Sequence, residues 1–329
     1  MTVVDVHTHM LCDEWVRRIR KYGAPAYAVG KRPDGQEGLI EHGVPTMALQ
    51  PALFDYKHRL RCMDEAGIDI AILSLTSPNV YWGSAAVSAE SARVINDDMA
   101  AAQRAYPGRI RYLASLPWQY PELAVQELMR ACDTGAVGVM VLANIEGRHL
   151  TDPLFAPIWG EIDRRRLPVL VHPTAPIGAE KMDLDSVRLH PTVGFTFDTS
   201  LAVLRMVLEG FFDRYPNLKI IAAHGGGFLP FIVGRIDMFY RSNFPYQKKI
   251  AEPPSSYLKR IYYDAVVYQM DSLQMCINLA GAEHVLFGTD FPMPTDIPRI
   301  LGQVNALPDS QAEKVRGGNA VRIFNLETS

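Results

Sequence analysis

Val3-Val4-Asp5-Val6-His7-Thr8-His9 is the stretch of sequence that decides the fold. Its apolar residues are typical of a β-strand, in which successive side chains point to opposite faces. His7 and His9 therefore point to the same face, where two imidazoles can bind one metal ion. The stretch predicts a first strand that ends in half of a metal site.

Three later apolar stretches end in residues of the same ligand types. They are residues 168–172, which end in His172, residues 219–224, which end in His224, and residues 285–290, which end in Asp290. A histidine and a carboxylate from later strands would complete, with His7 and His9, a site for Zn²⁺ or a similar divalent ion. We predict that His172 and Asp290 are these two ligands.

Eight strand candidates alternate with helical patterns along the chain. They are residues 3–9, 69–75, 110–116, 137–142, 168–172, 218–224, 260–264 and 285–290. Most are nearly continuous apolar runs, as expected for parallel strands that are buried on both faces. A strand followed by a helix, repeated in this way, predicts a TIM-type (β/α)8 barrel, and 329 residues suffice for one barrel with insertions.

A doubly wound open sheet is the competing interpretation. It would usually place a glycine-rich phosphate-binding loop after the first strand, whereas residues 7–15 read His-Thr-His-Met-Leu-Cys-Asp-Glu-Trp. We therefore predict a single barrel domain over residues 1–329. Residues 12–54 follow the carboxyl end of the first strand and contain scattered glycines and prolines. They are expected to form a small insertion, a lid over the barrel mouth.

The composition argues against several classes of function. Hydrophobic residues make up 48% and charged residues 21% of the chain, which is ordinary for a soluble globular protein. The net charge of −3 gives no basic footprint for nucleic acid, and no apolar run approaches the ~20 residues that cross a membrane. The N-terminus lacks a signal-peptide pattern, and the four cysteines form no CxxC motif. We therefore expect a cytoplasmic protein with reduced thiols.

His224 and Asp290 are the candidates for catalysis. His224 opens a run of three glycines, which lets backbone approach a ligand and leads into the N-terminus of a helix. A histidine that titrates near neutrality suits acid/base work there. It could instead be a fifth ligand, but three histidines, one carboxylate and a water already fill the usual shell. Asp290 could bind the metal and also accept a proton from metal-bound water.

Three further residues are candidates for substrate binding. Arg235, on the helix after His224, could clamp a carboxylate or form a surface salt bridge. Trp82, after the second strand, could face the substrate or belong to the core. His190, in the long loop after the fifth strand, could contact the substrate or be solvated.

Taken together, these motifs resemble the amidohydrolase-related metal-dependent decarboxylases, and within them the 2-amino-3-carboxymuconate-6-semialdehyde decarboxylase branch. The resemblance extends from residue 3 to about Phe324. It is carried by Val4–His9, Leu170–Pro173, Ala223–Gly227 with Gly234-Arg235, Gly288–Pro292, Met63–Gly67 and Gly318–Ala320.

The resemblance implies a role for each motif residue. His7, His9, His172 and Asp290 match the metal ligands, and His224 matches the acid/base histidine. Arg235 matches an arginine that enters the active site of the neighbouring subunit, which implies a homodimer. The family metal is expected to be one divalent ion, with Zn²⁺ preferred and Mn²⁺ as the alternative.

One departure from the branch concerns the substrate. The pattern has a second substrate-binding arginine before the helix that follows the insertion, but Met47 aligns there and no arginine lies between Arg32 and Arg59. The substrate is therefore expected to be a less acidic aromatic acid, such as a salicylate-type acid, or a ring-cleavage product.

Three functions remain open at this point. The first is nonoxidative decarboxylation of an aromatic or unsaturated carboxylic acid, with His224 as the proton shuttle and Arg235 as the carboxylate anchor. The second is metal-dependent hydrolysis of an amide, lactone or carbon–carbon bond at the same site. The third is a non-catalytic barrel that a metal stabilises, which would have a closed coordination shell.

Overall fold

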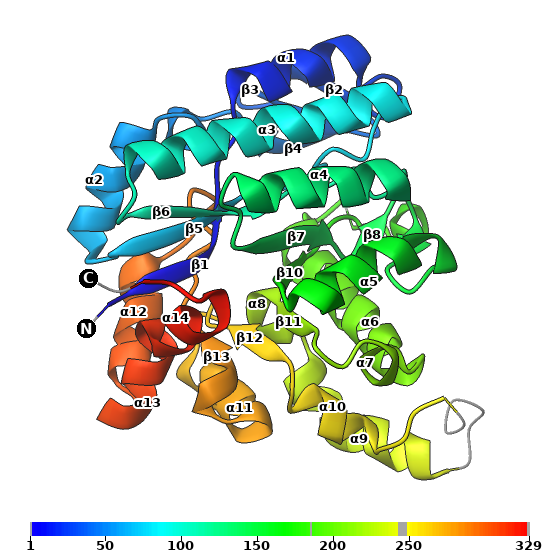
Figure 1. Cartoon of the computed structure of the whole chain (residues 1–329), viewed down its shortest axis with the longest axis vertical. Coiled ribbons are helices and arrows are strands. Elements are labelled where there is room, and N and C mark those ends of the chain that lie inside the picture. The colour runs from blue at the N-terminus through cyan, green and yellow to red at the C-terminus, as the bar shows by residue number, and fades with distance from the viewer. Residues whose placement is uncertain (1, 185, 243–248, 328–329) are drawn as a thin grey trace.

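The structure is a computed structural model that describes residues 2–184, 186–242 and 249–327; the rest of the predicted 1–329 domain lies outside this description. Within these residues, eight parallel strands form one sheet (Figure 1). In the order of the sheet they are β1 (Val4–His9), β5 (Ile70–Ser74), β6 (Ile110–Ala114), β7 (Gly138–Leu142), β10 (Pro168–His172), β11 (Lys219–Ala222), β12 (Tyr262–Asp264) and β13 (Val285–Leu286).

The sheet closes into a barrel between its last and first strands. The backbone N–H of Val6 donates to the carbonyl of Phe287 over 3.1 Å, and that of His9 donates to the carbonyl of Phe291 over 2.8 Å. Asp5 adds a side-chain link, because its carboxylate accepts the hydroxyl of Thr289 at 2.6 Å. The predicted TIM-type (β/α)8 barrel is confirmed.

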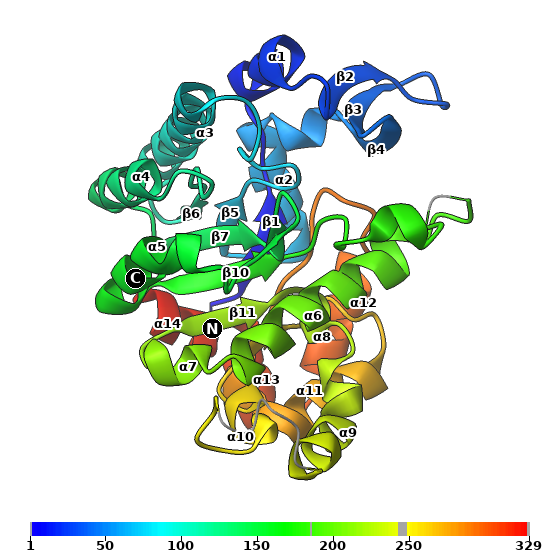
Figure 2. The same cartoon turned by 90° about the vertical axis from the view of Figure 1, so that its right-hand side faces the viewer.

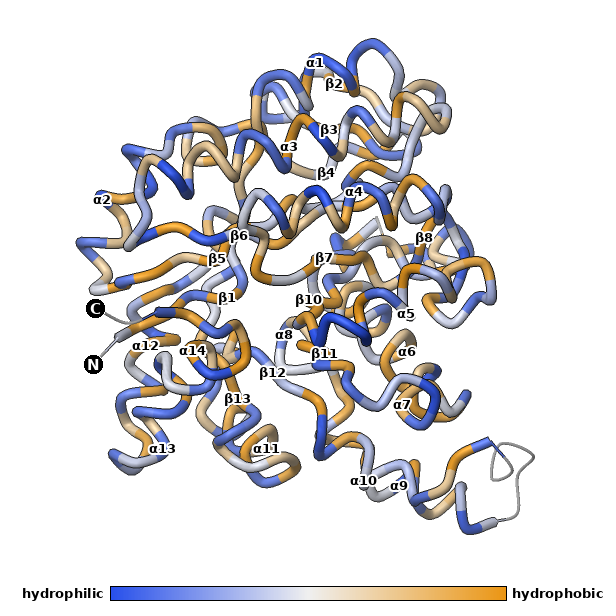
Figure 3. Tube along the Cα trace, in the orientation of Figure 1, coloured by the Kyte–Doolittle hydropathy of each residue, from blue (hydrophilic) through white to orange (hydrophobic). Residues whose placement is uncertain are grey.

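Helices cover the outside of the barrel. They are α1 (Asp13–Tyr22), α2 (Tyr56–Ala66), α3 (Ala85–Ala105), α4 (Pro121–Asp133), α5 (Ala156–Arg165), α6 (Phe195–Leu208), α7 (Phe211–Arg214), α9 (Leu229–Arg241), α10 (Pro254–Leu258), α11 (Met270–Ala280), α12 (Ile297–Asn305), α13 (Asp309–Glu313) and α14 (Asn319–Phe324). The short segment α8 (Ala223–Gly226) is instead a turn after β11, with left-handed backbone at His224 and Gly225. Figure 3 shows hydrophobic residues along the strands, whereas the outer helices alternate between hydrophobic and hydrophilic residues. Such alternation is typical of helices that bury one stripe of side chains and leave the other side exposed.

Local sequence explains where these helices begin and end. Asp55 caps α2, because its carboxylate accepts the backbone N–H of Lys57 at 2.8 Å and of His58 at 3.0 Å. The helix ends at Gly67, whose φ of 69° is accessible to glycine at little cost. In the part of the chain that the structure describes, no helix is both long and apolar enough to cross a bilayer.

The insertion after β1 has secondary structure that the sequence pattern did not predict. After α1, the described residues form an antiparallel sheet of β2 (Tyr27–Lys31), β3 (Glu37–Glu41) and β4 (Val44–Ala48). These strands are short and their burial does not alternate regularly from residue to residue, so their sequences lack a clear apolar alternation. Figure 2 places this sheet on the side toward which β7 and β10 point. There the hydroxyl of Tyr27 donates to Glu146 over 2.7 Å.

Candidate active site

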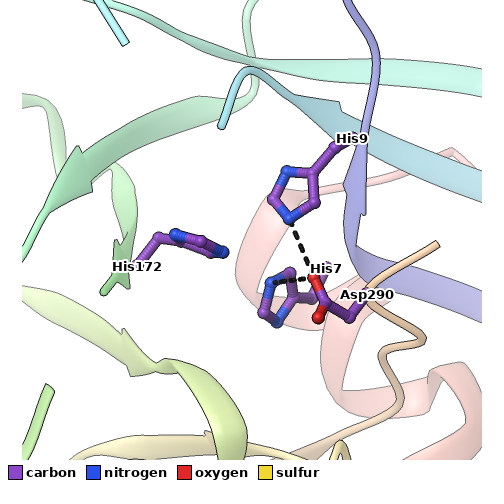
Figure 4. Close-up of side chains that lie close together, drawn as sticks. All are labelled: His7, His9, His172 and Asp290. Atoms are coloured by element: carbon purple, nitrogen blue, oxygen red, sulfur yellow. Dashed lines mark hydrogen bonds and ion pairs between the residues drawn. The ribbon is translucent and has the colours of Figure 1, made fainter. Parts of the chain in front are cut away.

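Four side chains meet at the carboxyl ends of the barrel strands (Figure 4). His7, His9, His172 and Asp290 each offer one ligand atom, and these atoms lie within 4.8 Å of one another. The imidazole rings of His9 and His172 are 4.8 Å apart between centroids, although they come from β1 and β10. The barrel thus brings together the four residues that the sequence pattern selected as metal ligands.

Each of the three histidines directs its Nε2 atom toward the centre of this cluster, because its Nδ1 atom already has an acceptor. Nδ1 of His7 lies 2.7 Å from Oδ2 of Asp264, that of His9 lies 3.2 Å from the carbonyl of Leu75, and that of His172 lies 2.8 Å from the carbonyl of Pro173. A hydrogen bond of this kind fixes the tautomer with a proton on Nδ1 and leaves Nε2 for a metal ion.

Burial keeps two of these imidazoles neutral. Desolvation lowers the pKa of His9, and it lowers the pKa of His172 well below the usual value, which suits a ligand that must bind through a lone pair. His7 differs. Burial opposes its charged form, but hydrogen bonds with Asp264 and Asp290 outweigh this and raise its pKa to about 10. A proton on His7 therefore occupies the place between the carboxylates that a metal cation would take.

Asp264 holds His7 and the turn after β11 in place through hydrogen bonds. Its Oδ2 accepts from Nδ1 of His7 and, over 3.0 Å, from the backbone N–H of His224, and its Oδ1 accepts from the N–H groups of Gly225 at 2.9 Å and Val266 at 3.1 Å. Burial alone would raise the pKa of this fully buried carboxyl. The hydrogen bond from His7, together with the other interactions, outweighs burial, so the pKa of Asp264 lies below its usual value. The structure thus pairs Asp264 with His7.

His224 and Asp290 do not lie in strands, contrary to the predicted strands 218–224 and 285–290. β11 ends at Ala222 and β13 at Leu286, and both residues follow in left-handed backbone, with φ of 55° and 61°. A left-handed residue cannot continue a strand, and for a non-glycine residue it is a strained conformation that often marks a functional site. The turns bring Nε2 of His224 to 3.5 Å from Oδ2 of Asp290.

The other predicted contacts are not among the four clustered residues and come from other elements. Arg235 is exposed on α9, with its guanidinium 4.7 Å from the ring centroid of Phe239. Trp82 is only 4% exposed, and its indole N–H donates to the carbonyl of Asn79 over 3.0 Å, so it packs in the core. His190 is half-buried at the start of the helical turn His190–Gly194, just before α6.

Sequence reasoning missed one buried residue beside the ligands. Arg59 on α2 is 2% exposed; its guanidinium donates to the hydroxyl of Thr8 and the carbonyl of His9, and it lies 4.4 Å from the ring centroid of Phe291. Burial lowers its pKa to about 10. One feature of the sequence could have indicated that Arg59 is buried: it follows Tyr56 by three residues and so lies on the apolar stripe of the predicted helix.

A second missed group lies next to β10. Asp198 on α6 is 2% exposed and accepts from the N–H of Thr174 at 3.0 Å and from Nδ2 of Asn144 at 3.1 Å. Burial raises its pKa to about 7. It holds the loop that begins immediately after His172, and nothing in its local sequence pattern distinguishes it from a surface residue.

Comparison with known proteins identifies relatives of the whole chain. A family model described as amidohydrolase matches residues 4–326. The 2-amino-3-carboxymuconate-6-semialdehyde decarboxylase of Dictyostelium discoideum is 29% identical, with 98% of this chain and 92% of that protein aligned. The gamma-resorcylate decarboxylase of Rhizobium radiobacter is 33% identical, over 85% of this chain and 90% of that protein.

Solved structures agree in fold. The crystal structure of 5-carboxyvanillate decarboxylase from Sphingomonas paucimobilis has a TM-score of 0.88 and 26% identity, covering 99% of each chain. A dihydroxybenzoic acid decarboxylase from Polaromonas, with bound manganese and the inhibitor 2-nitroresorcinol, has a TM-score of 0.83 and 26% identity, covering 100% of this chain and 98% of that one.

Proposed function

The chain belongs to the amidohydrolase family, and on this premise we propose that it is a metal-dependent decarboxylase of an aromatic or unsaturated ring-cleavage carboxylic acid. The observation that carries the proposal is the cluster of His7, His9, His172 and Asp290 with His224 beside it. The full-length relatives that act on aromatic acids or carboxymuconate semialdehyde support the same class of substrate.

The four clustered residues fit a single divalent ion. Nε2 of His7 is buried and lies 3.3 Å from Oδ1 of Asp290, the same oxygen that Nε2 of His9 approaches to 3.0 Å. These three atoms converge as the ligands of one cation would. Three imidazoles and one carboxylate suit Zn²⁺, our preferred ion, and the manganese in the Polaromonas structure makes Mn²⁺ the alternative. When bound, such an ion supplies Lewis-acid polarisation of substrate oxygens.

His224 supplies the proton in the proposed reaction. The bond between the ring carbon and the carboxyl carbon breaks, its electron pair stays on the ring carbon, and CO₂ leaves. The ring carbon then takes a proton from His224, whose side chain is 15% exposed and so remains accessible from the mouth. Oδ2 of Asp290 lies 3.5 Å from Nε2 of His224, so this carboxylate can orient the imidazole for the transfer. Of the other predicted contacts, His190, half-buried just before α6, remains a candidate to touch the substrate, whereas the buried Trp82 packs in the core.

We also propose a homodimer in which Arg235 anchors a carboxylate in the neighbouring active site. Phe231, Arg235 and Met238 are spaced as one face of α9, and Phe231 and Met238 are 76% and 51% exposed. Large exposed apolar side chains along one helix face are typical of an interface. A guanidinium on such a face can bind a carboxylate of the partner's substrate through two hydrogen bonds.

Hydrolysis at the same site is the second candidate function. The same ligands could serve it, but the relatives named above are decarboxylases, which favours loss of CO₂.

The test is metal analysis of the purified protein together with CO₂ release from hydroxybenzoates and muconate-type acids. We expect about one equivalent of metal and CO₂ release that a chelator abolishes and Zn²⁺ or Mn²⁺ restores. Incorporation of water-derived oxygen into the product, without CO₂, would support the hydrolase instead.

A matched pair of variants tests the roles of the residues. His224→Ala should keep the metal and lose most turnover, whereas Asp290→Ala should lose both. If metal content falls in parallel in His224→Ala, His224 is a ligand rather than the proton donor.

A further inference from the structure

Of the four clustered residues, His172 comes from the far side of the barrel. β10, which ends at His172, is the fifth of the eight strands in the order of the sheet, which begins with β1. Oδ1 of Asp290 lies within 3.3 Å of Nε2 of both His7 and His9. The dashed lines of Figure 4 join these three side chains but not His172. The orientation of His172 therefore depends on groups on its own side of the barrel.

One peptide group connects His172 to a buried carboxyl group. Nδ1 of His172 lies 2.8 Å from the carbonyl oxygen of Pro173, which accepts the proton of the ring. The N–H of the same peptide belongs to Thr174, and it donates to Oδ2 of Asp198 over 3.0 Å. The C=O and N–H of a trans peptide lie in one plane and point in opposite directions. The imidazole therefore lies at one end of this peptide group and Asp198 at the other.

This peptide group lies beyond the hydrogen bonds of the sheet. The pairing of β10 with β7 ends where His172 lies opposite Leu142, and β10 itself ends at His172. A peptide outside the sheet keeps its orientation only where another group binds its N–H or its C=O. Asp198 is such a group and is itself held in place, because it is 2% exposed on α6 and its Oδ1 accepts from Nδ2 of Asn144 over 3.1 Å.

We propose that Asp198 is a positioning residue for the metal ligand His172. By accepting from the N–H of Thr174, it fixes the plane of the peptide, and the carbonyl of Pro173 then keeps the proton on Nδ1 and directs Nε2 toward the ion. A hydrogen bond at the N–H also polarises the peptide and strengthens the carbonyl as an acceptor, which makes the imidazole a more basic ligand. This inference rests on the proposed function, because it assumes that the cluster binds a divalent ion.

The test compares Asp198→Ala and Asp198→Asn, with Thr199→Val as the matched control. Alanine removes the acceptor of the Thr174 N–H, whereas the amide oxygen of asparagine can still accept from it. Thr199 is the next residue on α6 and is fully buried, and its hydroxyl has no hydrogen-bond partner among the described residues. Valine at this position therefore changes a buried neighbour of Asp198 without removing a hydrogen bond that the structure describes.

Three quantities are measured on each protein. Zn²⁺ affinity is measured by competition with a chelator, and CO₂ release is measured with hydroxybenzoates and muconate-type acids. The Nδ1 protons of the zinc-loaded proteins are observed by NMR with ¹⁵N-labelled histidine, and His172→Gln identifies the signal of His172. The NMR signal is the measurement that a merely structural role would not move selectively.

We expect Asp198→Ala to bind Zn²⁺ about tenfold more weakly, at the lower end of the range for a lost partner of a metal ligand. Asp198→Asn should lie between Asp198→Ala and the wild type. The Nδ1 proton of His172 should move upfield in Asp198→Ala because its hydrogen bond weakens, whereas the signals of His7 and His9 should stay in place. Thr199→Val should match the wild type in all three measurements.

Wild-type affinity with an unchanged His172 signal in Asp198→Ala overturns the role of Asp198, even if CO₂ is released. Equal movement of the signals of His7, His9 and His172 also overturns it, because the whole site would then have loosened. If Asp198→Ala does not fold, the same criteria apply to Asp198→Asn. The expected changes without CO₂ release from any acid by the wild type support Asp198 and overturn decarboxylation. A wild type that binds no Zn²⁺ overturns both.

Discussion

Replacing Asp264 with asparagine would test how the metal site is held. Asp264→Asn preserves the shape of the side chain but exchanges one oxygen for an NH₂ group. In the wild type both oxygens accept two N–H donors each: Oδ2 from His7 and His224, Oδ1 from Gly225 and Val266. Whichever way the amide turns, its NH₂ group faces two donors and cannot accept from them.

The magnitude depends on which pair of donors loses its acceptor. If the NH₂ group faces Gly225 and Val266, two buried N–H groups are left unpaired at about 1–3 kcal/mol each, so the free energy of unfolding falls by roughly 2–6 kcal/mol. If it faces His7, Nδ1 must become an acceptor, and the proton moves to Nε2, the atom that the metal needs. Loss of such a supporting partner typically lowers metal affinity by about 10–100-fold.

The assay is competition for Zn²⁺ with a chelator of known affinity, with urea unfolding of the metal-free protein alongside. Asp163→Asn is the control, because Asp163 also accepts two hydrogen bonds, both from Asn217, but lies on α5 outside the barrel. We expect Asp264→Asn to lose metal affinity or stability by the amounts above, and Asp163→Asn to keep wild-type metal affinity. An Asp264→Asn protein with wild-type metal affinity and stability would refute the reasoning.

Three further predictions follow from buried or exposed groups elsewhere in the structure. Arg59→Met should lower the free energy of unfolding by about 3 kcal/mol or more in urea titrations, because it leaves buried acceptors unpaired, the His9 carbonyl among them; wild-type stability would contradict this. The raised pKa of Asp198, about 7, means that the folded protein holds a proton that the unfolded chain releases near pH 4. Stability should therefore fall by up to a few kcal/mol between pH 4 and 7 in the wild type, and less steeply in Asp198→Asn; parallel curves would exclude this contribution. Phe231→Asp should convert the proposed dimer to a monomer in sedimentation experiments. If the wild type is itself a monomer, Phe231 contacts no partner subunit, and the substitution should leave the melting temperature unchanged.

Much of the fold could be predicted because strands and helices leave local signals. The apolar runs at residues 3–9, 69–75 and 168–172 became β1, β5 and β10 within one residue at either end. The predicted ends of β11 and β13 were wrong. The apolar residues continue toward His224 and Asp290, but both of these residues have left-handed backbone, which cannot belong to a strand. Apolar composition is insensitive to the sign of φ.

The cluster of ligands was predictable for a related reason. Parallel strands of a barrel end at the same face, so chemically similar residues at strand ends converge whatever separates them in sequence. This placed His7, His9, His172 and Asp290 together. The insertion was expected at the mouth from its place in the chain, but its sheet was not, because short strands without a regular alternation of buried and exposed residues carry little hydrophobic signal.

By itself, the sequence determined the barrel and the types of atom that meet at its mouth, since both follow from short-range periodicity and the order of strands. Only the tertiary structure decided which carboxylate supports His7, why Arg59 is buried, and that Glu41 accepts a hydrogen bond from Ser77. The partners of such contacts lie far apart in the chain, 257 residues in the case of His7 and Asp264. Their pairing depends on the three-dimensional packing of whole elements, to which local patterns are insensitive.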